Sequence, residues 1–96
     1  MVDAANRGDV EAFLDSFVAT GVVDDWGREF AGREAIRGWS DAEFIGKRVT
    51  LAVTEVEQDG ARTVVTAEVG GDGFNGPSHF TFDTDGPLLG RMTIRA

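Results

Sequence analysis

Hydrophobic residues recur with helical spacing near the start of the chain. In the segment GDVEAFLDSFVATG the later ones lie three, four, seven and eight positions after the first, at Val10, Phe13, Leu14, Phe17 and Val18. Asp9 directly precedes this run, where its carboxylate can accept the free N–H groups of a helix N-terminus. The pattern predicts an amphipathic helix over residues 9–19 that ends at Gly21.

A second helical pattern follows in REAIRGWSDAEFIG. Its apolar stripe is formed by Ala35, Ile36, Trp39 and Ala42. We expect a helix over residues 33–45 that Gly38 weakens slightly and that Gly46 closes in the left-handed conformation.

After Gly46 the pattern changes to the two-residue alternation that is typical of strands. Strands are predicted over residues 47–57, 61–70, 77–84 and 88–95, with Asp-Gly turns at Asp59 and Asp85. Two short strands, at 22–25 and about 29–31, are expected to form a small hairpin before the second helix. Helices followed by an antiparallel meander indicate an α+β fold with the helices packed on one face of the sheet.

The composition narrows the classes of partner. A chain of 96 residues has room for one core, so a single domain spanning residues 1–96 is expected. Its net charge of −8 disfavours nucleic acid and anionic membranes as partners. The absence of cysteine excludes thiolate chemistry, and the absence of a signal-like N-terminus predicts a cytoplasmic protein. His79 is the only histidine; we predict that it lies at the surface or an interface, and no metal site is predicted.

Two features raise questions of chemistry. In VVDDWG, the adjacent acids Asp24 and Asp25 end an apolar strand, and strand alternation sends one of them toward the core. The segment GDGFNG matches the glycine spacing of a dinucleotide phosphate loop, but Pro77 and a strand follow where a helix would be needed. This segment is therefore interpreted as a flexible connection, and no cofactor is predicted.

The segment AANRGDVEAFLDSFVATGVVDDWGREFAGREAIRGW resembles the opening of the nuclear transport factor 2-like superfamily, in its SnoaL-like and ketosteroid-isomerase-like branch. The shared motifs are an N-x-G-D helix start, a V-x-D strand and F-x-G-x-x-A-I-R, and SHFTF resembles the penultimate strand of that branch. The resemblance implies a cystatin-like fold, in which a curved antiparallel sheet forms a cone around a pocket and the helices cover its concave side. It also implies that most of the first helix is missing, so either the chain starts late or the pocket is open at one end.

The resemblance assigns roles to particular residues. The catalytic base of ketosteroid isomerases matches Asp25, which would face the pocket, while Asp24 would point to solvent, Arg28 or Arg33. The acid of the oxygen-binding pair matches Ser78. The counterpart of the tyrosine would fall at about Met1, and the chain has no tyrosine, so steroid isomerase activity is not expected. The residues expected to line a pocket for a small hydrophobic molecule are Trp26, Phe30, Trp39, Ser78, Phe80 and Phe82.

Three classes of function remain open. The chain could be an isomerase-, cyclase- or dehydratase-type enzyme with Asp25 as general base, a ligand-binding module without chemistry, or a dimerisation module in which Asp25 is structural. A homodimer is expected through the outer face of the sheet, because that face is unusually neutral for a chain with 27% charged residues. It is predicted to carry Thr50, Ala52, Thr54, Thr66, His79, Thr81 and Thr93, with Glu68, Arg91 and Arg95 as charged exceptions.

Overall fold

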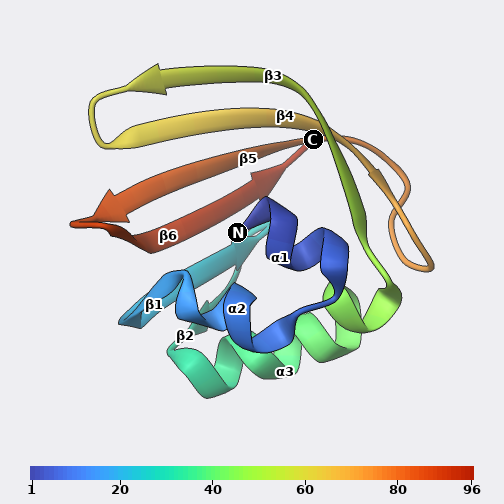
Figure 1. The fold of residues 1–96 in the computed structure, drawn as a ribbon, viewed down its shortest axis with the longest axis horizontal. Helices are drawn as coiled ribbons and strands as arrows, with labels where there is room; N and C mark the ends of the chain where they lie inside the picture. The colour runs from blue at the N-terminus through green and yellow to red at the C-terminus, as the bar shows by residue number, and fades with distance from the viewer.

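A computed structural model describes residues 1–96 as one six-stranded sheet and a layer of short helices. The helices are α1 (Val2–Arg7), α2 (Val10–Asp15), α3 (Arg33–Glu43) and the 3₁₀ helix η1 (Ile45–Lys47). The strands are β1 (Phe17–Asp25), β2 (Arg28–Ala31), β3 (Thr50–Asp59), β4 (Arg62–Gly70), β5 (Gly76–Asp85) and β6 (Leu88–Arg95). The sheet is strongly curved and unclosed, and all helices lie on its concave side (Figure 1). The predicted α+β class and curved sheet are confirmed.

The strands lie in the order β2-β1-β6-β5-β4-β3. Four of the neighbouring pairs are antiparallel, as expected, but β1 runs parallel to β6. The expectation of a purely antiparallel sheet was wrong here because β1 and β6 lie at opposite ends of the chain. No hairpin turn joins them, so local turn chemistry does not set their relative direction.

The first predicted helix is shorter than its hydrophobic pattern indicated. It ends at Asp15, and the chain turns at Ser16 into strand β1. The carbonyl of Ser16 accepts the N–H of Leu89 at 2.8 Å, which joins the turn to β6. The segment that follows is rich in β-branched residues, which favour a strand over a helix. Phe17 fits both patterns, since its side chain is buried in either conformation.

Helix α1 has only six residues and ends at Gly8, whose φ of 71° is left-handed. Asn6, in the N-x-G-D motif, fastens this helix to the sheet. Its side-chain amide donates to the carbonyl of Leu51 at 3.0 Å and accepts the N–H of Leu51 at 2.6 Å. The motif therefore anchors the helical layer to the beginning of β3. None of the helices is long and apolar enough to cross a membrane.

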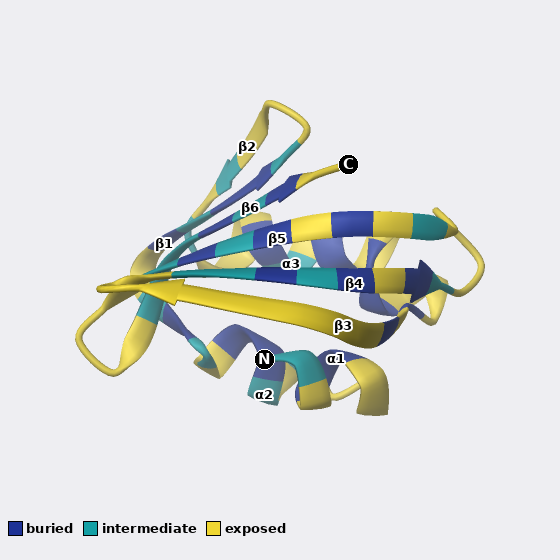
Figure 2. Ribbon diagram, turned by 90° about the horizontal axis from the view of Figure 1, so that it is seen from above, coloured by how far each residue is buried: buried dark blue, intermediate teal, exposed yellow.

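The core lies between the helices and the concave face of the sheet, and Figure 2 shows buried residues alternating with more exposed ones along β4, β5 and β6. Aromatic rings fill its centre. The ring centre of Phe13 lies 5.4 Å from that of Phe17 and 5.5 Å from that of Phe44. The rings of Trp39 and Phe44 are stacked, with their centres 4.9 Å apart. Aromatic pairs at such distances add to the stabilisation from burial. This cluster ends on one side at an open cavity, where the predicted site residues gather.

Candidate functional site

A cavity of about 540 Å³ opens between the concave face of the sheet and the helical layer. Its walls come from the β1–β2 turn, the C-terminal part of α3, η1, and the ends of β4 and β5 with the loop that joins them. The lining is mainly apolar, but it includes four charged side chains, Asp25, Arg28, Glu43 and Lys47. An apolar cavity with a few polar groups is typical of small-molecule sites.

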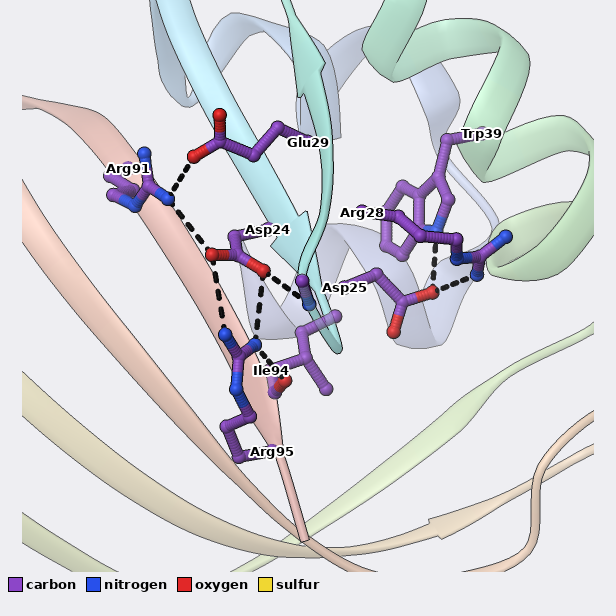
Figure 3. A network of polar contacts seen from close by, with 9 residues as sticks. Asp24, Asp25, Arg28, Glu29, Trp39, Arg91, Ile94 and Arg95 are labelled. Atoms are coloured by element: carbon purple, nitrogen blue, oxygen red, sulfur yellow. Dashed lines mark hydrogen bonds and ion pairs between the residues drawn. The ribbon is translucent and has the colours of Figure 1, made fainter.

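Asp25 is the last residue of β1 and lies in the cavity wall. One of its carboxylate oxygens, Oδ2, accepts two hydrogen bonds, from the Trp39 indole N–H at 3.0 Å and from Arg28 at 2.6 Å (Figure 3). No protein group hydrogen-bonds the other oxygen, Oδ1, and it is not sealed from solvent. The carboxylate is therefore held rigidly through one oxygen and presents the other.

Arg28, the first residue of β2, is itself held by helix α3. Its two terminal nitrogens donate to the two carboxylate oxygens of Glu43 at 3.0 and 2.7 Å. This paired contact lowers the pKa of Glu43 and raises the pKa of Arg28. Phe30 packs beneath the same guanidinium, 5.7 Å from its ring centre, and lies 6.2 Å from Trp39. The groups that position Asp25 thus come from both β2 and α3.

Asp24 lies on the opposite face of the sheet, as strand alternation requires, but its partners differ from the prediction. It contacts Arg95, Arg91 and the N–H of Gly27, and neither Arg28 nor Arg33 (Figure 3). Its side chain is 10% exposed, compared with 16% for Asp25, so the expected solvent exposure is also wrong. The Arg95 hydrogen bond, aided by Gly27 and Arg91 and opposed by burial, lowers the pKa of Asp24 to about 2. The parallel pairing of β1 with β6 brings both arginines to this carboxylate.

The structure brings four of the six predicted lining residues to the cavity, Trp26, Trp39, Ser78 and Phe80. Ser78 as a residue is only 2% exposed, but its hydroxyl makes no hydrogen bond within the protein and is not sealed from solvent. Two of the six are elsewhere. Phe30 supports Arg28 and Trp39 from outside the cavity. Phe82 stacks on Phe80 and faces a second, more open depression of about 790 Å³ near the N-terminus.

Several lining residues were not predicted, among them Arg28, Glu43, Phe44, Lys47 and Phe74. Phe44 directly follows the end of α3. It lies eight residues after Ile36 and so continues the helical spacing, which is a signal that the stripe ending at Ala42 did not use. Phe74 lies in the β4–β5 loop, where no periodicity applies. The charge complementarity of Arg28 with Glu43 can also be seen in the sequence, but pairing them requires the tertiary contact to be known. No three His, Cys, Asp or Glu side chains lie close enough to one another to ligate a metal ion.

Comparisons with known proteins agree with this architecture. The family model described as the SnoaL-like domain matches residues 1–90. A candidate polyketide cyclase from Sinorhizobium meliloti superposes with a TM-score of 0.86 at 26% identity, covering 98% of this chain and 88% of the other. A hypothetical protein with a ketosteroid isomerase-like fold from Catenulispora acidiphila, in complex with trimethylamine, gives 0.83 at 24% identity, covering 99% and 80%. A computationally designed 17-OHP binder gives 0.84 at 17% identity, covering 99% and 83%. No curated protein matches the chain.

Proposed function

This chain belongs to the SnoaL-like domain family, and we propose that it binds a small apolar molecule in the cavity and acts on it by acid–base chemistry of the isomerase or cyclase type. The observation that carries the proposal is the geometry of Asp25. Its Oδ2 is anchored by Arg28 and Trp39, and its Oδ1 has no partner at the wall of an apolar cavity. A positioned carboxylate with one free oxygen is suited to take a proton from a bound carbon or oxygen acid and to return it.

In the proposed reaction Asp25 Oδ1 removes a proton from a carbon next to a carbonyl group of the ligand. The negative charge that develops on the carbonyl oxygen needs a hydrogen-bond donor. Ser78 is suited to this role because it lines the cavity and its hydroxyl, which has no partner in the protein, is not sealed from solvent. Arg28 and Glu43 act as positioning residues, since they hold the carboxylate and need not contact the ligand.

The similarity to the candidate polyketide cyclase supports a reaction of this type. Two other proteins of this fold are described with a small organic molecule, trimethylamine in one and 17-OHP in the other, which supports use of the fold for small-molecule binding. The chain has no tyrosine that could complete the oxygen-binding pair of a steroid isomerase, so the proposal is limited to the general reaction type.

A second candidate function is ligand binding without chemistry. It is favoured by the two donors on Asp25 Oδ2, which also tie the β1–β2 hairpin to α3 and so give the carboxylate a structural task. In that case Asp25 would fix the shape of the cavity and its free oxygen would accept a donor from the ligand. The same variant separates the two candidates.

We expect Asp25→Asn to abolish proton transfer while the cavity keeps its shape, because the substitution replaces the free acceptor by a group that cannot act as a base. The probe is 2-tetralone, a bicyclic ketone with exchangeable protons next to its carbonyl. Its binding is measured by the shift in unfolding midpoint, and loss of its α-proton NMR signal in D₂O is measured against buffer. The wild-type protein should accelerate exchange by about 100-fold, a gain typical of general base catalysis.

The matched control is Asp41→Asn, which removes a carboxylate that is exposed on α3 and makes no ion pair. This control should bind 2-tetralone and exchange its protons as the wild type does. Stabilisation by 2-tetralone without acceleration of exchange would support the binding module and refute the chemistry. Absence of stabilisation by 2-tetralone and by a panel of other small apolar molecules would refute the cavity as a binding site.

We also propose that the chain forms a homodimer through the convex face of the sheet. The centre of this face carries short, uncharged side chains, Val64, Thr66, Thr81 and Thr93, which are half-buried in the single chain. His79 is exposed on the same face, next to Thr66. The proposed contact is made by this uncharged centre, which Glu55 and Glu57 border on one side and the Asp24 cluster with Arg91 and Arg95 borders on the other.

A further inference from the structure

The turn between β1 and β2 has an unusual residue in a strained position. Asp25 pairs with Arg28, so the hairpin loop consists of Trp26 and Gly27 alone. Both have positive φ, 55° for Trp26 and 88° for Gly27, as a type I′ turn requires. Asn, Asp and Gly are preferred at the first of these positions, and a bulky side chain there is disfavoured. Asn, Asp or Gly at position 26 would therefore make this turn more stable than Trp26 does.

The indole of Trp26 does not compensate for this strain by burial. Trp26 is 56% exposed, and yet it lines the cavity beside Asp25. Backbone strain that is not offset by burial of the side chain is often found at functional sites.

The β4–β5 loop carries a second exposed aromatic residue at the same cavity. Phe74 is also 56% exposed and belongs to the GDGFNG segment. The sequence of this segment predicts a flexible connection without a phosphate-binding role. The structure shows instead a loop that is fixed to its neighbours and that presents this ring.

Hydrogen bonds and close backbone approaches fix the loop. The N–H of Asp72 donates to the carbonyl of Lys47 at 2.7 Å, and Arg48 donates to the Asp72 carboxylate at 2.8 Å. Gly71, at φ 122°, lies so near η1 that a Cβ atom there would come within 2.7 Å of the carbonyl oxygen of Arg48. Inside the loop, the Asn75 amide donates to the carbonyls of Gly71 and Gly73.

We propose that Trp26 and Phe74 form an aromatic entrance to the cavity, contact the ligand through their ring faces and select ligands with a flat ring. This inference rests on the proposed binding function and adds two specificity-determining residues to it. Two elements far apart in the sequence, the β1–β2 turn and the β4–β5 loop, each place an exposed aromatic side chain in the lining of the same cavity. Stacking against a flat ring would bury both side chains, and this favourable contact would offset the backbone strain at Trp26.

The central test is Trp26→Asn, which creates the Asn-Gly pair that a type I′ turn favours. The unfolding midpoint of the free protein should rise by about 4 °C because the strain is removed. Its affinity for 2-naphthol, measured by calorimetry, should fall by about 3- to 10-fold because the ring contact is lost. Phe74→Ala should weaken 2-naphthol binding by a similar factor without raising the midpoint.

Selectivity is read from a second ligand, trans-decahydro-2-naphthol, which has the same carbon skeleton and hydroxyl group but puckered rings. Both variants should reduce the preference of the protein for 2-naphthol over this saturated compound. The control is Val56→Ala, which removes an apolar side chain that is 57% exposed but lies outside the cavity; its affinities should equal those of the wild type.

The outcomes separate the two proposals. If the wild type binds 2-naphthol and the Trp26 and Phe74 variants bind it equally well, the aromatic entrance is refuted and the binding function stands. The entrance is also refuted if both ligands lose affinity by the same factor, since ring shape would then not be sensed. If the wild type binds neither compound but is stabilised by members of the 2-tetralone panel, the entrance is refuted and the binding function stands. If nothing in that panel binds either, the binding function fails, and the entrance fails with it.

Discussion

Asp24 is the residue whose charge matters most for the acid stability of the fold. Its pKa falls from about 3.8 in the unfolded chain to about 2 in the folded protein, chiefly because Arg95 donates to it. A lowered pKa means that the contribution to stability is fully present above about pH 4 and is lost as the pH falls toward 2. The shift corresponds to about 2 kcal/mol of unfolding free energy.

We expect Asp24→Asn to lower the unfolding free energy at pH 7 by about 2 kcal/mol, since it leaves Arg95 without its carboxylate partner. The difference from the wild type should shrink to less than about 1 kcal/mol at pH 2.5, where Asp24 is already protonated in the unfolded chain and begins to be protonated in the folded protein. Urea titrations at the two pH values measure it, with Asp41→Asn as the control. A difference that does not change with pH would contradict the role assigned to the Asp24 charge.

The orientation of Asp24 and Asp25 could be predicted from the sequence, but the hydrogen-bond partners of Asp24 could not. Adjacent residues of a strand face opposite sides, which separates the two acids, and the family resemblance assigns the inward position to Asp25; the structure has Asp25 in the cavity wall and Asp24 on the other face. The partners of Asp24 could not be read from the sequence. Arg91 and Arg95 are 67 and 71 residues away along the chain, and only the pairing of β1 with β6 brings them near.

At the scale of elements, two glycines near the same helix are expected to respond in opposite ways to one substitution. Gly38 lies inside α3, and a Cβ there would meet nothing within 4 Å. Gly38→Ala should therefore raise the unfolding free energy by about 0.5–1 kcal/mol, by restricting the unfolded chain and favouring the helix. A Cβ on Gly46 would lie 1.6 Å from the carbonyl oxygen of Asp41, so Gly46→Ala should cost more than about 2 kcal/mol.

Urea denaturation of the two variants beside the wild type measures both effects. Equal effects of the two substitutions would contradict the close approach of η1 to α3. The sequence had suggested that Gly46 closes the helix in the left-handed conformation, which the structure corrects. Arg48 adopts that conformation, with φ 53°, and Gly46 is needed because backbone passes against backbone.

Alternation predicted β3, β4, β5 and β6 to within a few residues. β4, β5 and β6 each have one buried face, whereas in β3 only Leu51 is buried. Residues 17–25 were more difficult, because Phe17 and Val18 continue the helical spacing of α2. Both a helix and a strand are compatible with the pattern of residues 17–25, and pairing with β6 selects the strand. This long-range pairing cannot be read from a single sequence. The fixed conformation of the β4–β5 loop could not be predicted from the sequence either, because the loop is held by contacts with Lys47 and Arg48 at the end of η1.

At the scale of the whole molecule, the family resemblance supplied the curvature of the sheet, which local patterns cannot give. The cavity follows from that curvature, because helices packed across a curved sheet leave space at one end. Its chemistry depends on residues from separate elements, such as Arg28 from β2 and Glu43 from α3. The sequence could therefore nominate Asp25 but not the pair that positions it.

The convex face is the surface on which the proposed homodimer depends, and one added charge at its centre should prevent association. Thr81 lies on the central strand β5, opposite Val64 on one side and Thr93 on the other. Thr81→Lys would place an ammonium group among the uncharged side chains at the centre of this face, and desolvating a charge in an interface is costly. We expect the wild type to be a dimer and this variant a monomer by light scattering at micromolar concentration.

Ala42→Lys adds the same charge to an exposed position of α3, on the opposite side of the molecule, and should leave the dimer intact. Association also links stability to concentration, so the unfolding midpoint of the wild type should rise with protein concentration, whereas that of Thr81→Lys should not. A wild type that is monomeric at micromolar concentration would refute the dimer. A dimer that survives Thr81→Lys would place the interface elsewhere on the molecule.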